Sequence, residues 1–149
     1  MTVTSHDIPG VRDFRYWGAA NMAHVLIVDD DPDFRDAVRF ILEDADHEVL
    51  EASDGTTGLQ ILRDSQERLI VLLDMLIPKL NGIDLLRMVV ADPQLKERHV
   101  YLLMTGGSKL LRREAGPLLA EVSARIVDKP FEMDDLLAIV DEAAEQRPA

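Results

Sequence analysis

The stretch LIVLLD at residues 69–74 decides the fold class of this chain. Its first five residues are all aliphatic, no wholly apolar run in the sequence is longer, and its sixth residue is a carboxylate. A short apolar run of this kind is typical of a strand that is buried on both faces of a parallel sheet. The charge that ends such a strand needs a compensating partner. We therefore predict a central strand over residues 69–73 and a polar site around Asp74.

Short apolar segments and amphipathic segments alternate on both sides of this strand. Further strands are predicted at 24–28, 47–51, 100–104 and 125–128. One helix is predicted to begin at Pro32, with Asp31 as its N-cap, and a second to begin after a cap at Ser53 or Asp54. Three more are predicted over 84–91, 109–121 and 132–146. We expect Pro93 to close the first of these three and Gly116-Pro117 to break the second. This alternation predicts an α/β fold, a doubly wound five-stranded parallel sheet with helices on both faces. We expect the flavodoxin-like strand order 2-1-3-4-5, in which ligands bind where strands 1 and 3 meet.

The composition fits one domain of ordinary size. The chain has 149 residues, with 28 Asp and Glu against 16 Lys and Arg, and a formal net charge of −12. This acidity argues against nucleic acid as a direct partner, because binding phosphates requires clustered basic side chains. Cysteine is absent, which excludes disulfides and thiolate chemistry and agrees with the cytoplasmic location that we expect. No apolar run is long enough for membrane insertion.

Residues 1–22 show neither the helical nor the strand period, and they contain the turn signal Pro9-Gly10. We expect this segment to be a disordered extension or a start that is set too early, because Met22 lies just before the first strand. A docking role, suggested by the aromatic pair Tyr16-Trp17, is the less favoured alternative. The charged residues in this segment leave no apolar stretch for a secretory signal.

Polar side chains follow each strand that would reach the ligand-binding edge. Asp29 and Asp30 follow the first strand, Asp74 the third and Thr105 the fourth, and Lys129 follows the fifth. Clustered carboxylates repel one another unless a proton or a cation neutralises them, and oxygen ligands of this kind suit Mg²⁺. A hydroxyl and an ammonium beside such a site are what an incoming phosphoryl group requires.

Four stretches carry a resemblance to a known family. They are VLIVDDDPDFR (25–35), VLLDMLIPKLNG (71–82), LLMTGG (102–107) and DKPF (128–131). In this order, and each at a predicted strand end, they resemble the receiver domains of response regulators in two-component signalling, with CheY-like proteins as the single-domain form. The resemblance covers residues 23–147, which we take as the receiver domain. We expect no output domain.

The resemblance implies a metal site and a phosphoacceptor. Asp74 matches the phosphoacceptor, whose carboxylate forms an acyl phosphate. Asp29 and Asp30 match the acidic pair that holds Mg²⁺. The backbone carbonyl of Leu76 and the carboxylate of Asp74 match further ligands of the same ion.

The resemblance also implies how the phosphoryl group is held. Thr105 matches the hydroxyl that closes on this group, and Lys129 matches the ammonium that pairs with it. In the family, the peptide bond between Lys129 and Pro130 would be cis.

A phosphoryl group would come from a sensor histidine kinase or a histidine phosphotransfer protein. The chain would then signal by protein–protein contact or pass the group on in a phosphorelay, and it would catalyse only its own phosphorylation and slow dephosphorylation. The downstream partner would bind the face formed by the fourth helix, the fifth strand and the last helix, where Lys109, Arg112 and Arg113 form a local basic patch.

The sequence departs from the family pattern at three positions near this site. Leu76 and Gly107 stand two residues after Asp74 and Thr105, where many receivers carry polar side chains. With no polar group there to orient water, we expect slow self-dephosphorylation or reliance on a separate phosphatase. Ile126 stands where the family usually has an aromatic switch residue, so we expect the readout of activation to be aliphatic or to lie elsewhere.

Other interpretations stay open for single residues. Asp31 and Asp54 are predicted to be helix caps alone, Asp29 and Asp30 could lie in a solvated loop, Thr105 could cap a helix, and Lys129 could be a surface lysine. His6, His24, His47 and His99 have no partner at metal-ligand spacing.

Two other function classes compete with a phosphorylated receiver. A phosphatase of the haloacid-dehalogenase type would use Asp29 as nucleophile and Asp31 as acid, but Pro32-Asp33 departs from its motif. A degenerate receiver would bind partners without phosphorylation.

Overall fold

The computed structural model describes residues 22–107 and 109–145. In chain order, the elements are β1 (His24–Val28), α2 (Pro32–Asp44), β2 (Glu48–Ala52), α3 (Gly55–Asp64), β3 (Leu69–Asp74), α4 (Gly82–Val90), α5 (Pro93–Arg98), β4 (Val100–Thr105), α6 (Lys109–Leu119), β5 (Ala124–Asp128) and α7 (Met133–Glu145). The expectations for residues 1–21 lie outside the described part of the chain.

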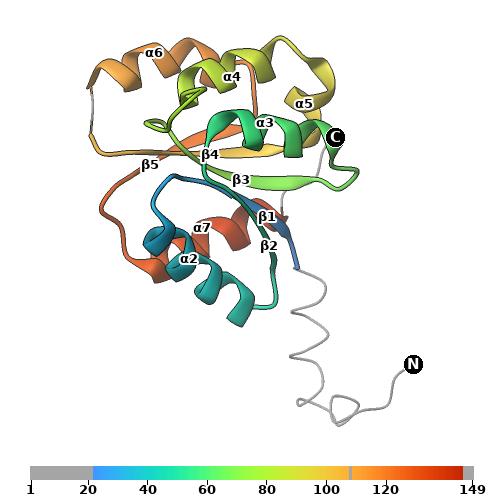
Figure 1. The fold of residues 1–149 in the computed structure, drawn as a ribbon, viewed down its shortest axis with the longest axis vertical. Coiled ribbons are helices and arrows are strands. Elements are labelled where there is room, and N and C mark those ends of the chain that lie inside the picture. Colours follow the sequence, from blue (N-terminus) through green and yellow to red (C-terminus); the bar gives the residue numbers. More distant parts are fainter. Residues whose placement is uncertain (1–21, 108, 146–149) are drawn as a thin grey trace, which may run out of the picture.

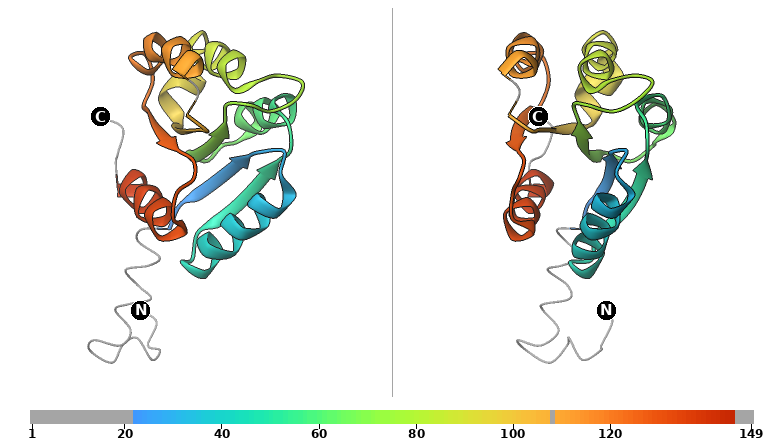
Figure 2. Two further views of the ribbon diagram at one scale, coloured as in Figure 1. Left: turned by 90° about the vertical axis from the view of Figure 1, so that its left-hand side faces the viewer. Right: turned by 60° about the vertical axis from the view of Figure 1, so that its left-hand side comes forward.

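The strands form one parallel sheet in the order β2-β1-β3-β4-β5, which confirms the predicted fold class and strand order. Helices α2 and α7 cover one face of the sheet, and α3, α4, α5 and α6 cover the other (Figures 1 and 2). The central position of β3 between β1 and β4 follows from its composition, because only a strand flanked on both edges and both faces can bury five apolar residues.

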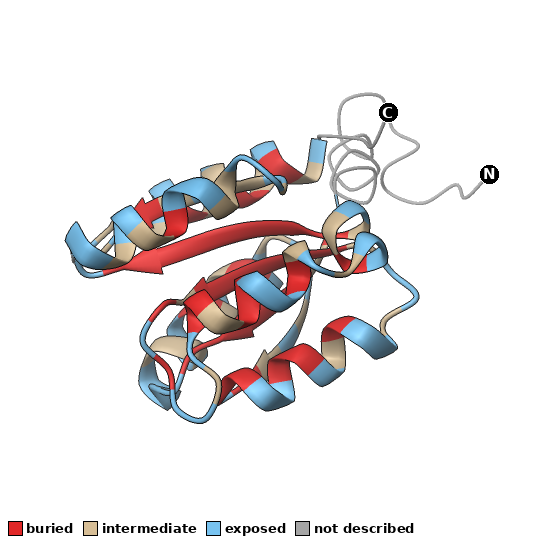
Figure 3. Ribbon diagram, turned by 90° about the horizontal axis from the view of Figure 1, so that it is seen from above, coloured by how far each residue is buried: buried red, intermediate tan, exposed pale blue. Residues whose placement is uncertain are grey.

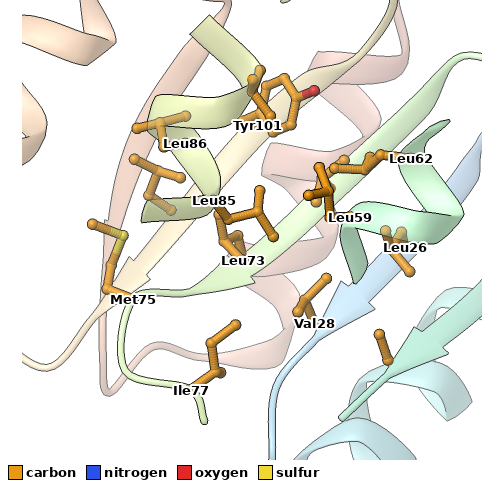
Figure 4. Packing of buried hydrophobic residues seen from close by; sticks show 14 of the residues in the cluster. Leu26, Val28, Leu59, Leu62, Leu73, Met75, Ile77, Leu85, Leu86 and Tyr101 are labelled. Atoms are coloured by element: carbon orange, nitrogen blue, oxygen red, sulfur yellow. The ribbon is translucent and has the colours of Figure 1, made fainter. Parts of the chain in front are cut away.

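The side chains of β3 alternate between two cores. Leu69, Val71 and Leu73 pack toward α3 and α4, and Ile70 and Leu72 pack toward α2 and α7. All five are at most 1% exposed. Figure 3 shows the buried strands between helices whose outer faces are exposed, and Figure 4 shows the contacts around Leu73 in the first core. The sheet edge at the end of β3 therefore rests on a rigid frame.

The structure corrects the prediction at Pro93. This residue does not close the preceding helix, which ends at Val90, but begins the short helix α5. The side chain of Asp92 accepts hydrogen bonds from the backbone N–H groups of Gln94 and Leu95, at 3.0 and 3.5 Å. An Asp-Pro pair is a helix start, as it is at Asp31-Pro32, where the predicted cap is confirmed.

The predicted break at Gly116-Pro117 is also wrong, because α6 continues to Leu119 with Pro117 inside it. A proline costs a helix the hydrogen bond of its own missing N–H and must place its ring clear of the preceding turn. Both residues are exposed, and only two helical residues follow Pro117, so the helix loses little. The described helices include none that is long and apolar enough to cross a membrane.

Two of the histidines serve the fold. His99 is 1% exposed; its Nδ1 accepts a hydrogen bond from the Leu69 N–H at 2.9 Å, and its Nε2 lies 3.2 Å from the Leu62 carbonyl. His47 accepts from the Ala23 N–H at 3.0 Å. Each imidazole ring therefore holds the backbone at the start of a strand, His47 at β1 and His99 at β3.

His99 makes the stability of the fold depend on pH. Burial lowers the pKa of His99 from 6.5 to about 4, so the unfolded chain binds a proton there that the folded chain does not. The contribution of His99 to the free energy of unfolding is fully present above pH 6.5. We expect the free energy of unfolding to fall by up to about 3 kcal/mol as the pH drops toward 4. Urea unfolding of the parent and of a His99→Gln variant, at pH 7 and pH 4.5, measures this contribution. The variant should lose less stability between the two values; equal losses would contradict the assignment.

Candidate functional site

The functional residues predicted from the sequence meet at one edge of the sheet. Asp29 directly follows β1, Asp74 ends β3 and Thr105 ends β4. Val28 pairs with Leu73, so Asp29 and Asp74 leave neighbouring strands at the same level. Because all strands are parallel, their carboxyl ends lie together, and the point between β1 and β3 is where the strand order reverses.

Three carboxylates gather at this point. One oxygen from each of Asp29, Asp30 and Asp74 lies within 4.8 Å of the others, which is close enough to hold one metal ion. Asp29 is 1% exposed, Asp74 is half-buried and Asp30 is exposed. A set of oxygen ligands that is open to solvent on one side fits a hard cation such as Mg²⁺, which keeps several of its waters.

Asp29 is held at every polar atom. Its N–H donates to the Ala52 carbonyl at 3.0 Å, and its own carbonyl accepts from the Arg35 guanidinium at 2.7 Å. One side-chain oxygen accepts from the Asp31 N–H at 2.9 Å, and the other accepts from Lys129 at 3.1 Å. This carboxylate is therefore fixed in place before any ligand binds.

Lys129 lies between two of the carboxylates. Its ammonium is 3.1 Å from Asp29 and 3.4 Å from Asp74, and it lies 4.5 Å from the centre of the Phe34 ring. Its backbone N–H donates to the Thr105 carbonyl at 2.7 Å. Partial burial would lower the pKa of Lys129, but the hydrogen bonds and charges of the two carboxylates outweigh it and raise the pKa. The side chain is thus a firmly charged cation, and its peptide bond to Pro130 is cis, as the resemblance implied.

Asp74 combines a half-buried carboxylate with a nearby negative charge. Burial is the main reason that its pKa is raised, and the charge of Asp29 adds to the effect. The Leu76 N–H, which donates to Asp74 at 3.0 Å, and the Lys129 ammonium act in the opposite direction. A further cation at this site would favour the ionised form, which is the form that can act as a nucleophile.

Thr105 is 3% exposed, and its hydroxyl oxygen accepts a hydrogen bond from the Gly107 N–H at 3.3 Å. Gly107 has a φ of +96°, a conformation that suits a residue with no side chain. The structure thus brings Asp29, Asp30, Asp74 and Lys129 into one cluster, with Thr105 at the end of the adjacent strand.

A hollow of about 490 Å³ opens beside Lys129, lined by Asp31, Phe34, Lys129, Pro130, Phe131 and Met133. Two of these side chains, Phe34 and Phe131, pack edge to face, with their ring centres 5.9 Å apart. Neither this hollow nor the contact of Arg35 with Asp29 was predicted from the sequence. The sequence signal that could have pointed to the hollow is Phe131, the last residue of the DKPF stretch.

A comparison with family models identifies the family of this domain. The model described as "Response regulator receiver domain" matches residues 25–141. The chain belongs to this family. Receiver domains are signalling modules rather than metabolic enzymes, and they act in two-component systems.

Individual relatives agree with this assignment. The chain is 35% identical over 117 residues to the transcriptional regulatory protein CpxR of Escherichia coli, which covers 78% of this chain and 47% of CpxR. The chain thus spans about half the length of the curated relatives that it matches here, such as CpxR and the regulator RpaA of Synechocystis. Among solved structures, the CheY-like receiver domain protein of Methanospirillum hungatei is 26% identical, with a TM-score of 0.64 over 82% of this chain and 94% of that one.

The fold is also that of the receiver domain of the sensor histidine kinase PA1611 from Pseudomonas aeruginosa, with a TM-score of 0.71 at 19% identity, over 84% of this chain and 99% of that one. That domain was crystallised with a magnesium ion coordinated in its active-site cleft.

Proposed function

We propose that this receiver domain, over residues 23–147, accepts a phosphoryl group on Asp74 from a histidine kinase or a histidine phosphotransfer protein. The observation that carries the proposal is the cluster of Asp29, Asp30 and Asp74, with Lys129 against two of its three carboxylates. We propose that Asp29, Asp30, Asp74 and the carbonyl of Leu76 hold Mg²⁺. When bound, this ion would neutralise charge on the phosphoryl oxygens.

The chemistry assigns a task to each side chain. A carboxylate oxygen of Asp74 attacks the phosphorus, and the bond between phosphorus and the donor's nitrogen or oxygen breaks, so that the electron pair leaves with the donor. The product is an acyl phosphate. Lys129 pairs with a phosphoryl oxygen, and the hydroxyl of Thr105 donates to another. Since the carboxylate of Asp29 is held by the N–H of Asp31, the site needs little reorganisation.

The hollow beside Lys129 supports a protein as phosphodonor. Phe34 and Phe131 offer an apolar surface next to the ammonium that would meet the phosphoryl group. A protein that brings a phosphohistidine to Asp74 would bury this surface, whereas a small donor has no need of it. We propose that this hollow is part of the contact with the phosphodonor.

We propose that the signal leaves through the face of α6, β5 and α7. Ile126 lines a small apolar space together with Thr105, Met75 and Leu111, and it takes the place of the aromatic residue usual in the family. A shift of Thr105 toward a phosphoryl group would therefore change the packing of the aliphatic side chain of Ile126. Lys109 and Arg113 are exposed on this face, while Arg112 pairs with Asp128.

Incubation with acetyl phosphate and Mg²⁺, followed by intact mass measurement, tests the proposal. We expect a shift of one phosphoryl group, which is lost when a chelator removes the metal. A phosphatase of the haloacid-dehalogenase type would instead hydrolyse phosphate esters continuously, and a degenerate receiver would show no shift. Either of these results would refute the proposal.

Leu76 sets the lifetime of the proposed phosphorylated form. Its side chain is 66% exposed next to Asp74 and has no polar atom that could orient an attacking water. A Leu76→Asn variant supplies such an atom, and we expect it to shorten the lifetime of the acyl phosphate about tenfold. The decay of the phosphorylated mass after removal of acetyl phosphate measures this. A parent lifetime of only seconds, or an unchanged lifetime in the variant, would contradict the role.

A further inference from the structure

The loop that follows the phosphoacceptor strand, residues 75–81, rests on the turn that begins α3. The N–H of Gly55 donates to the Pro78 carbonyl at 3.4 Å. A Cβ atom on Gly55 would overlap the carbonyl oxygen of Leu80. The backbones of the two segments are therefore in direct contact, and only glycine permits this approach.

Two further features fix the same loop. Lys79 has a φ of +69°, which side chains rarely adopt, and its ammonium lies 3.6 Å from the carboxylate of Asp54. The other oxygen of Asp54 caps α3 through the Thr57 N–H at 2.7 Å, so this carboxylate is tied to the helix. The loop is thereby bound to α3 by its backbone and by its one lysine.

The far end of the loop is clamped in the same way. The N–H of Gly82 donates to the Met75 carbonyl at 3.1 Å, and a Cβ atom on Gly82 would lie 2.6 Å from the Met75 Cα and 2.8 Å from the Asp74 carbonyl oxygen. Both ends of the loop are therefore held, one by β3 and the other by the start of α4. If Gly55 pushes on the loop, the backbone of residues 75–81 itself must change conformation.

We propose that Asp54 and Gly55 are positioning residues for the phosphorylation site: they hold the 75–81 loop so that the backbone at Leu76 is in place for Mg²⁺. Neither residue touches the metal or the phosphoryl group. The inference rests on the proposed function, because it takes the Leu76 carbonyl as a metal ligand. Groups that orient a metal ligand from outside typically change metal affinity by about 10- to 100-fold when they are removed.

The affinity for Mg²⁺, measured by calorimetry without any phosphodonor, tests this inference on the full chain. We expect a Gly55→Ala variant to bind Mg²⁺ roughly tenfold more weakly than the parent. Gly116→Ala is the matched control, because a Cβ atom at Gly116 would meet nothing within 4 Å. A residue with a merely structural role would lower the melting temperature without changing the affinity of the folded protein. Parental affinity in Gly55→Ala would therefore overturn the inference.

If Gly55→Ala does not fold, Lys79→Gln decides. Lys79 is 68% exposed, so its loss leaves the core intact. Removing a positive charge near a metal site would by itself tighten Mg²⁺ binding, whereas a loosened loop weakens it. We expect about twofold weaker binding, the size of effect that an exposed ion pair can exert. Unchanged or tighter binding overturns the inference.

Phosphorylation of the parent by acetyl phosphate is measured in parallel. A parent that binds Mg²⁺ and takes up the phosphoryl group, together with a Gly55→Ala variant of parental affinity, would overturn the positioning role and leave the proposed function standing. A parent that binds no Mg²⁺ would overturn both.

Discussion

An Asp74→Asn variant will take up no phosphoryl group from acetyl phosphate, and without Mg²⁺ it will be more stable than the parent. Replacing the attacking carboxylate by an amide removes the nucleophile, so the rate should fall at least about a thousandfold. The gain in stability has a separate cause. Burial and the charge of Asp29 raise the pKa of Asp74, so its ionised form destabilises the fold, and a neutral amide removes this destabilisation.

The sign of the stability effect can be checked with pH. A carboxyl group whose pKa is raised in the folded state costs stability above that pKa, and the cost disappears as the pH falls and the folded chain binds the proton. The advantage of Asp74→Asn should therefore be present at pH 7 and vanish as the pH approaches 3.8, the ordinary value for Asp. Asp64→Asn, at the end of α3, is the control and should keep parental phosphorylation. A phosphorylated Asp74→Asn chain would refute the assignment of the nucleophile.

A Lys129→Gln variant will separate phosphoryl transfer from metal binding. The ammonium of Lys129 lies 3.1 Å from Asp29 and 3.4 Å from Asp74, so it neutralises part of their charge. Without it, the phosphoryl group loses a charged donor, and we expect phosphorylation to slow by about 10²- to 10³-fold. The affinity for Mg²⁺ should stay equal or increase, because the ion no longer competes with a resident cation.

Mass measurement of the phosphorylation rate and calorimetry of Mg²⁺ binding give the two quantities for Lys129→Gln. Lys109→Gln, an exposed lysine at the start of α6, is the control. A parallel loss of metal affinity and phosphorylation in Lys129→Gln would show that the lysine only maintains the shape of the site.

The polar residues at the strand ends could be predicted from the sequence because the pattern that marks them is local. Each central strand is an apolar run that stops at a polar residue, and parallel strands bring such ends together. Asp29, Asp74 and Thr105 could therefore be placed without knowing any contact. The helix α5 could have been predicted as well, since Asp92-Pro93 repeats the signal of Asp31-Pro32.

The supporting contacts could not be predicted in this way. Arg35 reaches the Asp29 carbonyl from a helix, and its other interaction is with Glu51 on β2, so its direction depends on how α2 packs. The approach of Gly55 to Leu80 joins two loops that are 25 positions apart, and no periodicity encodes it. The sequence alone shows that Leu76 and Ile126 differ from the family pattern, but it does not show which side chains lie around them.

The most direct test of the central claim is to locate the phosphoryl group in the parent chain. Reduction of an aspartyl phosphate with borohydride converts the residue to homoserine, and trypsin then separates the candidates, because cleavage after Arg68 and Lys79 releases Asp74 in residues 69–79, while Asp29 and Asp30 lie in residues 16–35. We predict homoserine at position 74 and nowhere else. Homoserine in residues 16–35, as a nucleophilic Asp29 would give, would contradict the account.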